Sequence, residues 1–167
     1  MPEKATLERA RQDAREGKSA STQAGEFVKE EMDHIREGKH GARSTKQAIA
    51  IGLSKARRAG VKLRPPKKGK ASSSTRTKAA RDLRKGRSTS KKKTSKTRSR
   101  AVKGALKREG HRAASKKSLS RQAHQAARKR SAASRSAAAK KAARTKGPAG
   151  RKRAARKAAR TRQRQAA

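Results

Sequence analysis

The stretch STKQAIAIGLSKARRAGVKL, residues 44–63, decides the fold of this chain. Ser44 and Gln47 fit the S-x-x-Q capping box, in which the two side chains bind backbone N–H groups at a helix start. Gly60 suits the left-handed position that follows a helix end. The stretch therefore predicts a helix over about residues 45–59. Its apolar face consists of Ile49, Leu53 and Ala56.

Gly52 lies beside this apolar face. A glycine inside a helix costs about 1 kcal/mol relative to alanine. The missing side chain also allows another helix to approach closely. We favour the packing role over a merely tolerated glycine.

The residues before this stretch predict two further helices, at about 3–16 and 22–37. Pro2 precedes the first helix and Gly17 follows it, the usual asymmetry of helix termini. The second helix ends at Gly38 and carries apolar side chains at helical spacing. We therefore predict a mainly α protein with a small three-helix head. The face of the head that packs internally or binds a partner consists of Phe27, Met32, Ile35, Ile49, Leu53 and Ala56.

Charge divides the chain into two parts. Of the 167 residues, 53 are Lys or Arg and 11 are Asp or Glu, for a formal net charge of +42. Residues 1–63 contain 14 of the bases and 9 of the acids, whereas residues 64–167 contain 39 bases and 2 acids. The break coincides with Pro65 and Pro66, which stop any helix. We predict a mixed-charge helical head at 1–64 and a Lys/Arg/Ala/Ser-rich nucleic-acid-binding tail at 65–167.

The tail has little apolar surface to bury. The chain contains one aromatic residue, Phe27, and most of its apolar residues are alanines. Burial on this scale cannot offset a backbone entropy of roughly 1–2 kcal/mol per residue. Like charges four residues apart also repel along a helix. We therefore predict that the tail is long, largely disordered or transiently helical, with a weak helical pair at about 100–130.

The tripeptide Arg-Glu-Gly occurs three times, at residues 15–17, 36–38 and 108–110. A Gln-Ala pair follows each copy, but the distance from glycine to glutamine grows from 6 to 9 to 12 residues. A binding motif would keep its spacing, whereas a helix stop followed by a new start need not. We interpret the repeat as a helix stop. Its glutamate is not favoured by the helix dipole and has no explanation in the sequence.

The sequence predicts no enzyme, no cofactor and no catalytic residue. Cysteine is absent, and no phosphate-binding or metalloprotease motif occurs. His34 and His40 are separated by a glycine turn without an accompanying carboxylate cluster, so we predict two surface histidines and no metal site. No stretch is apolar for the ~20 residues that a membrane span requires. These features predict a cytoplasmic protein located in the nucleoid, with no membrane partner.

Nucleic acid is the predicted partner. Thirty-nine tail cations could neutralise the phosphates of about 20 base pairs of duplex DNA, with release of condensed counterions. The tail has no aromatic side chains of the kind that stack on unpaired bases, which favours double-stranded DNA over RNA. The predicted phosphate contacts are Lys67, Lys68, Lys70, Lys91, Lys92, Lys93, Arg128, Lys129, Arg130, Lys140, Lys141, Arg151, Lys152, Arg153, Arg156 and Lys157.

Three functions are compatible with this pattern. The first is sequence-independent DNA binding by phosphate neutralisation, with nucleoid-associated compaction or bridging. The second is a basic protein associated with RNA or ribosomes. The third is an adaptor whose helical head binds a protein partner while the tail anchors it to nucleic acid.

Residues 43–60, RSTKQAIAIGLSKARRAG, resemble a family of small, basic bacterial proteins classed as a domain of unknown function. The family pattern is R-S-x-K-Q-A-I-A-I-x-L-S-x-A-R-x-A-G, and the resemblance covers about residues 20–64. It implies a bacterial source and no catalytic residues. The tail is similar in composition alone to bacterial histone H1-like proteins.

Overall fold

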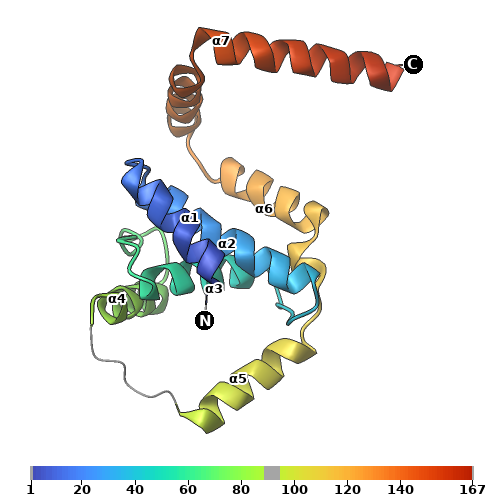
Figure 1. Cartoon of the computed structure of the whole chain (residues 1–167). Helices are drawn as coiled ribbons and strands as arrows, with labels where there is room; N and C mark the ends of the chain where they lie inside the picture. Colours follow the sequence, from blue (N-terminus) through green and yellow to red (C-terminus); the bar gives the residue numbers. More distant parts are fainter. Residues whose placement is uncertain (1, 89–94, 167) are drawn as a thin grey trace. The chain divides into compact units, whose positions relative to one another are not determined.

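The structure is a computed structural model that describes residues 2–88 and 95–166 (Figure 1). Every regular element in these two ranges is a helix. The helices in chain order are α1 (Lys4–Arg15), α2 (Ala20–Arg36), α3 (Thr45–Arg58), α4 (Ser73–Arg87), α5 (Lys96–Arg108), the 3-10 helix η1 (Arg112–Ala114), α6 (Lys116–Arg128) and α7 (Ala132–Ala166). The chain forms two compact units, the first ending at Gln122 and the second beginning at Ala123.

The first two Arg-Glu-Gly copies end helices α1 and α2 in the same way. Gly17 and Gly38 have φ values of 69° and 76°, the left-handed conformation expected after a helix end. The next N–H after each glycine closes the turn, from Lys18 to the Asp13 carbonyl at 2.9 Å and from Lys39 to the His34 carbonyl at 3.0 Å. The interpretation of these two copies as helix stops is confirmed.

The glutamate of the tripeptide binds the lysine that follows the glycine. Glu16 Oε2 lies 2.7 Å from Lys18 Nζ, and Glu37 Oε2 lies 2.9 Å from Lys39 Nζ. Hydrogen bonds from Lys18 to Asp13 and to Glu16 raise the pKa of the lysine. Each REGK sequence therefore carries an ion pair across its turn, which explains the glutamate that the dipole disfavours.

Helices α2 and α3 approach so closely at Gly52 that no side chain fits between them. A Cβ atom at this position would lie 2.7 Å from the Val28 Cα and 3.0 Å from the Phe27 carbonyl oxygen. Both of these are backbone atoms of α2, which cannot move aside independently. The packing role predicted for Gly52 is confirmed.

Two apolar clusters form the core of the first unit. One contains Ala10, Ala24, Phe27, Ala56 and Val61 and joins α1 and α2 to the end of α3. The other contains Met32, Ile35, Ala42, Ala48, Ala113 and Ala114. Partly buried side chains extend them: Leu7, Ala20, Leu53 and Leu63 in the first, and Val28, Ile49 and Leu119 in the second.

The prediction of a largely disordered or transiently helical tail was wrong. Helices α4, α5, α6 and α7 occupy most of the described part of residues 65–167. Serine starts most of them: Ser72, Ser95 and Ser115 each accept a hydrogen bond from the backbone N–H three residues later. Serine capping is worth about 1 kcal/mol per helix, and alanine has the best helix propensity. These local preferences favour helices despite the small apolar burial and the like-charge repulsion from which disorder was predicted.

Helix α4 packs on α3, and its buried acid Asp82 makes polar contacts between the two helices. Its Oδ2 accepts a hydrogen bond from the Ser54 hydroxyl at 2.6 Å, and its Oδ1 binds the Arg58 Nε at 2.7 Å. Burial lowers the pKa of the neighbouring Arg57, whereas the charge of Asp82 raises it. Asp82 is thus a docking residue for α4.

The third Arg-Glu-Gly copy, residues 108–110, contacts the loop that follows the second copy, residues 36–38. Glu109 is extended, with ψ 148°, and Gly110 does not adopt a positive φ. The Gly41 N–H donates to the Leu106 carbonyl at 2.9 Å, and the Ala42 N–H donates to the Gly110 carbonyl at 3.1 Å. The loop therefore satisfies carbonyl groups at the end of α5.

The short helix η1 then enters the core. Ala114 is fully buried, and Ala113 is 8% exposed. Thr45 Oγ1 donates to the Ala113 carbonyl at 2.7 Å, and Arg36 Nε donates to the Ala114 carbonyl at 3.0 Å. The first compact unit thus includes residues well beyond the charge boundary at 64/65. The assignment of nucleic-acid binding to residues 65–167 stays a prediction.

Replacing Gly52 by alanine should destabilise the first unit. We expect the free energy of unfolding to fall by about 1–3 kcal/mol, because the new Cβ overlaps the α2 backbone. Gly25→Ala is the matched control, since Gly25 is also helical but has nothing within 4 Å of its Cβ position. That variant should gain up to about 1 kcal/mol. Denaturation curves that rank the two variants in the opposite order would contradict the close approach.

Replacing Ala114 by a larger residue should also destabilise the first unit, although Ala114 lies far from α1, α2 and α3 in the sequence. Ala114→Leu overpacks a fully buried position and should cost about 1–3 kcal/mol in urea unfolding. Ala101→Leu, at an exposed position of α5, should change stability by less than about 0.5 kcal/mol. Equal stability of the two variants would mean that η1 does not belong to the core.

Candidate nucleic-acid interface

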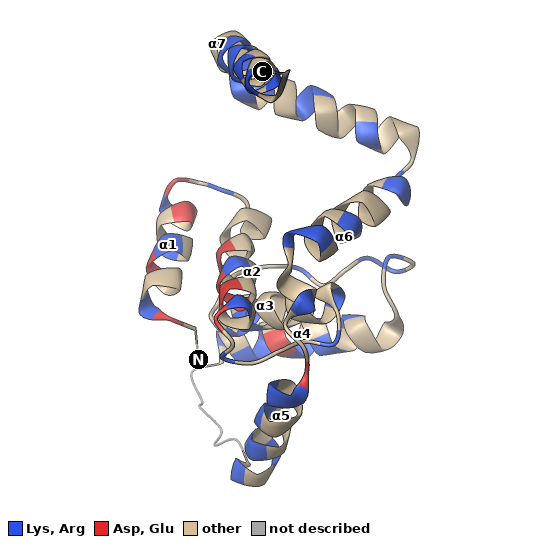
Figure 2. Ribbon diagram, turned by 90° about the vertical axis from the view of Figure 1, so that its right-hand side faces the viewer, with Lys and Arg blue, Asp and Glu red and all other residues tan. Residues whose placement is uncertain are grey.

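Acidic residues are confined to one part of the molecule. In Figure 2 the red segments lie mainly on α1 and α2, whereas α6 and α7 show only blue and tan. Some cations of the first unit pair with these acids, as in Arg9–Glu26 at 2.6 Å and Lys18–Asp13 at 2.8 Å. Their charge is therefore partly neutralised within the chain.

The second unit has cations and no acids. Residues 123–167 include 16 Lys or Arg and neither Asp nor Glu. Every Lys and Arg of α7 is exposed. A polyanion can therefore reach each of these charges without displacing an acidic side chain of the same unit.

The predicted phosphate contacts are all exposed where the structure describes them. Lys67, Lys68 and Lys70 lie in the connection between α3 and α4. Arg128 ends α6, and Lys129 and Arg130 connect it to α7. On α7 lie Lys140, Lys141, Arg151, Lys152, Arg153, Arg156 and Lys157. Lys91, Lys92 and Lys93 lie outside the described residues.

One face of α7 carries a continuous basic stripe, formed by Arg153, Arg156, Lys157, Arg160 and Arg164 around Thr161. The spacing of three and four residues places these side chains above one another on a helix. The first and last Cα atoms are about 16 Å apart at 1.5 Å per residue. Arg160 and Arg164 were missing from the predicted contacts, although their helical spacing from Arg153 and Arg156 signals them.

Helix α7 bends at Gly147, which has φ 63° and ψ 175° and precedes Pro148. Proline lacks the N–H needed within a helix and disfavours the helical conformation of the residue before it. The basic stripe lies entirely on the C-terminal side of this bend. The two helical segments of α7 therefore present their charges in different directions (Figure 1).

The predicted apolar face of the head is used inside the chain. Phe27, Ile35 and Ala56 are fully buried, and Met32 is 4% exposed. Ile49 and Leu53 are partly buried and pack against the two clusters. These six residues therefore pack inside the first unit.

The structure brings together one group of side chains that the sequence analysis treated as separate. Glu31, His34 and His40 place one possible ligand atom each within 4.8 Å of the others. We had noted the two histidines but not the carboxylate. The signal was available, because Glu31 and His34 are three residues apart on a predicted helix and must share a face.

None of the helices in the described ranges is both long and apolar enough to cross a membrane. No curated protein matches the chain, and no solved structure matches it. The match to a family model begins at the last residue of α1 and ends after α3, so it contains α2, α3 and the Gly52 contact between them. Residues 15–68 match the model of a family of unknown function (DUF6496).

Proposed function

We propose that the chain binds double-stranded DNA without sequence preference, by neutralising phosphates and bridging duplexes. The observation that carries this proposal is the second unit, where 16 cations occur without a single acid. In the bacterial cell that the resemblance of residues 43–60 implies, the DNA of the nucleoid is the polyanion to be compacted.

Helix α7 suits phosphate contacts. The basic stripe spans about 16 Å, and phosphates on one DNA strand lie about 3.4 Å apart along the axis. The stripe thus covers about five phosphates of one strand. Each contact releases condensed counterions, so binding is strong at low salt and weak at high salt.

The charges of α7 also favour bridging of two duplexes. Arg151, Lys152 and Arg153 are consecutive, so they project about 100° apart around the helix axis. Cations therefore lie on more than one side of the helix, and a duplex bound to the stripe leaves other cations exposed. A second duplex can bind these, which links two DNA segments.

Base recognition has little support in this surface. The described part of the tail presents no aromatic platform for unstacked bases. Phosphate contacts position a protein on DNA but carry no sequence information. We therefore expect similar affinities for unrelated duplexes.

The salt dependence of binding tests the role of the stripe. Substituting Arg153, Arg156, Arg160 and Arg164 with Gln should lower the slope of log K against log salt by about 3–4, roughly 0.9 per lost contact. The control exchanges Lys4, Arg11, Lys29 and Lys46 for Gln. It removes the same charge from exposed positions of the first unit and should leave the slope nearly unchanged. Equal slopes for both variants, or wild-type affinity that is unchanged at ~0.5 M salt, would contradict the proposal.

Competition distinguishes DNA from RNA, which offers the same phosphate chemistry. A labelled duplex of random sequence is displaced by unlabelled duplex DNA, double-stranded RNA or single-stranded RNA of equal length. We expect duplex DNA to compete best, since no stacking side chains reward unpaired bases. Stronger competition by either RNA would favour the alternative of an RNA- or ribosome-associated protein.

A further inference from the structure

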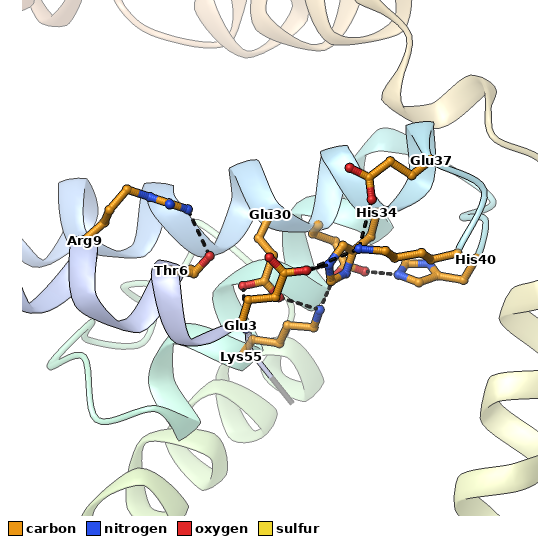
Figure 3. Close-up of polar contacts among 10 residues, drawn as sticks. Glu3, Thr6, Arg9, Glu30, His34, Glu37, His40 and Lys55 are labelled. Atoms are coloured by element: carbon orange, nitrogen blue, oxygen red, sulfur yellow. Dashed lines mark hydrogen bonds and ion pairs between the residues drawn. The ribbon is translucent and has the colours of Figure 1, made fainter.

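Three side chains that can bind a metal converge near the end of α2. Glu31 and His34 lie three residues apart on this helix, and His40 follows the Gly38 turn. Figure 3 shows His34 and His40 side by side. The two imidazole rings are 6.2 Å apart between centroids and stand nearly perpendicular, at 85°. We propose that Glu31, His34 and His40 form a binding site for one divalent transition-metal ion of the Zn²⁺ class.

The orientation of His40 is that of a metal ligand. Its Nδ1 lies 3.1 Å from the Gly41 carbonyl oxygen, which can only accept a hydrogen bond, so Nδ1 carries a proton. In the neutral ring, Nε2 then holds a lone pair. Metal-binding histidines in proteins usually have their second nitrogen fixed in this way by a carbonyl or a carboxylate.

The lone pair of His40 faces a carboxylate oxygen. Nε2 lies 3.3 Å from the Glu31 Oε1, and Glu31 is fully buried. Among the described residues, no hydrogen-bond donor satisfies this Oε1. Two acceptors that face each other at this distance repel unless a cation, either a proton or a metal ion, lies between them.

The distances favour a metal ion at this position. Two ligand atoms on a tetrahedral Zn²⁺, with bonds of 2.0–2.1 Å, lie about 3.3 Å apart. The distance between Glu31 Oε1 and His40 Nε2 has this value. The three possible ligand atoms lie within 4.8 Å of one another and offer two nitrogens and one oxygen. This donor set suits Zn²⁺ and related ions better than Ca²⁺ or Mg²⁺.

Lys55 is the competing cation, and it uses the other oxygen of Glu31. Its Nζ lies 2.6 Å from Oε2 and 3.5 Å from the Glu30 Oε1. A metal ion on Oε1 leaves this ion pair in place, because Lys55 binds the other carboxylate oxygen, Oε2.

The charge around the site accommodates a dication. Four carboxylates, those of Glu3, Glu30, Glu31 and Glu37, face the ammonium groups of Lys39 and Lys55, which leaves two negative charges when both histidines are neutral. Glu3 Oε1 lies 2.8 Å from His34 Nε2, where it anchors the ring or supplies a further oxygen ligand.

Titration of the full-length chain with Co²⁺ tests the site, because tetrahedral Co²⁺ absorbs visible light and Zn²⁺ should displace it. We expect one equivalent to bind. His40→Asn and His34→Asn should each weaken binding more than about tenfold, since even loss of a supporting partner costs 10–100-fold. His124→Asn is the control, because it removes an exposed histidine of α6. With only 11 acids in the chain, weak binding elsewhere should be slight.

Zn²⁺ should also raise the thermal midpoint of the wild type and of His124→Asn, but not of the two cluster variants. Circular dichroism checks that all variants keep their helices. A wild type that binds no Co²⁺ at millimolar concentration would overturn the proposal. Equal binding by the cluster variants and the control would also overturn it, and the cation between Glu31 and His40 would then be a proton.

Discussion

The contact between Gly52 and the backbone of α2 organises the first unit. Because α3 lies directly on Val28 and Phe27 at this point, side chains can fill space only on the two sides of the contact. The cluster around Phe27 and Ala56 lies on one side, and the cluster around Met32 and Ala48 lies on the other. A chain with one aromatic residue and few large apolar side chains can form a core only if its helices approach this closely. Alanine at the facing positions then fills most of the remaining space.

The scarcity of large apolar side chains also explains why the core of the first unit includes residues from far along the chain. The cluster around Met32 is completed by Ala113 and Ala114, whose carbonyl groups accept hydrogen bonds from Thr45 and Arg36. The two acids of residues 64–167 lie at such junctions. Asp82 binds Ser54 and Arg58 of α3, and Glu109 lies beside the loop that bonds to the end of α5. An isolated acid in a basic segment therefore marks a place where that segment meets the rest of the protein.

Local signals predicted the helices of the head well. The three expected ranges differ from α1, α2 and α3 by at most two residues at each end, because glycine stops and serine starts act within a few residues. One detail differed: Gln47 accepts a hydrogen bond from the Arg43 N–H rather than from Ser44. The tail was misjudged because we weighed its charge and its lack of large apolar groups above the serines that start its helices. Alanine propensity and capping act without burial, so an apolar stripe was not required.

The contacts between distant segments were beyond the sequence. Nothing in residues 108–115 distinguishes an alanine that enters a core from the many alanines that stay exposed. The proximity of Glu31 and His34 follows from their helical spacing and could be predicted from the sequence. The position of His40 beside them depends on the Gly38 turn, which the sequence does not specify in this detail. Three of the five cations of the basic stripe were predicted, because the prediction rested on clusters of adjacent charges rather than on charges at helical spacing.

The acid-free second unit has a consequence for the ions around it. With no carboxylate of its own, this unit gathers small anions from solution, as a nucleic acid gathers small cations. In the proposed complex with nucleic acid, both ion clouds would be released, so each partner would contribute entropy of mixing. The identity of the anion in the buffer, and not only its concentration, then becomes a variable of the association. Like nucleic acid, the second unit is a polyelectrolyte surrounded by counterions, but its charge has the opposite sign.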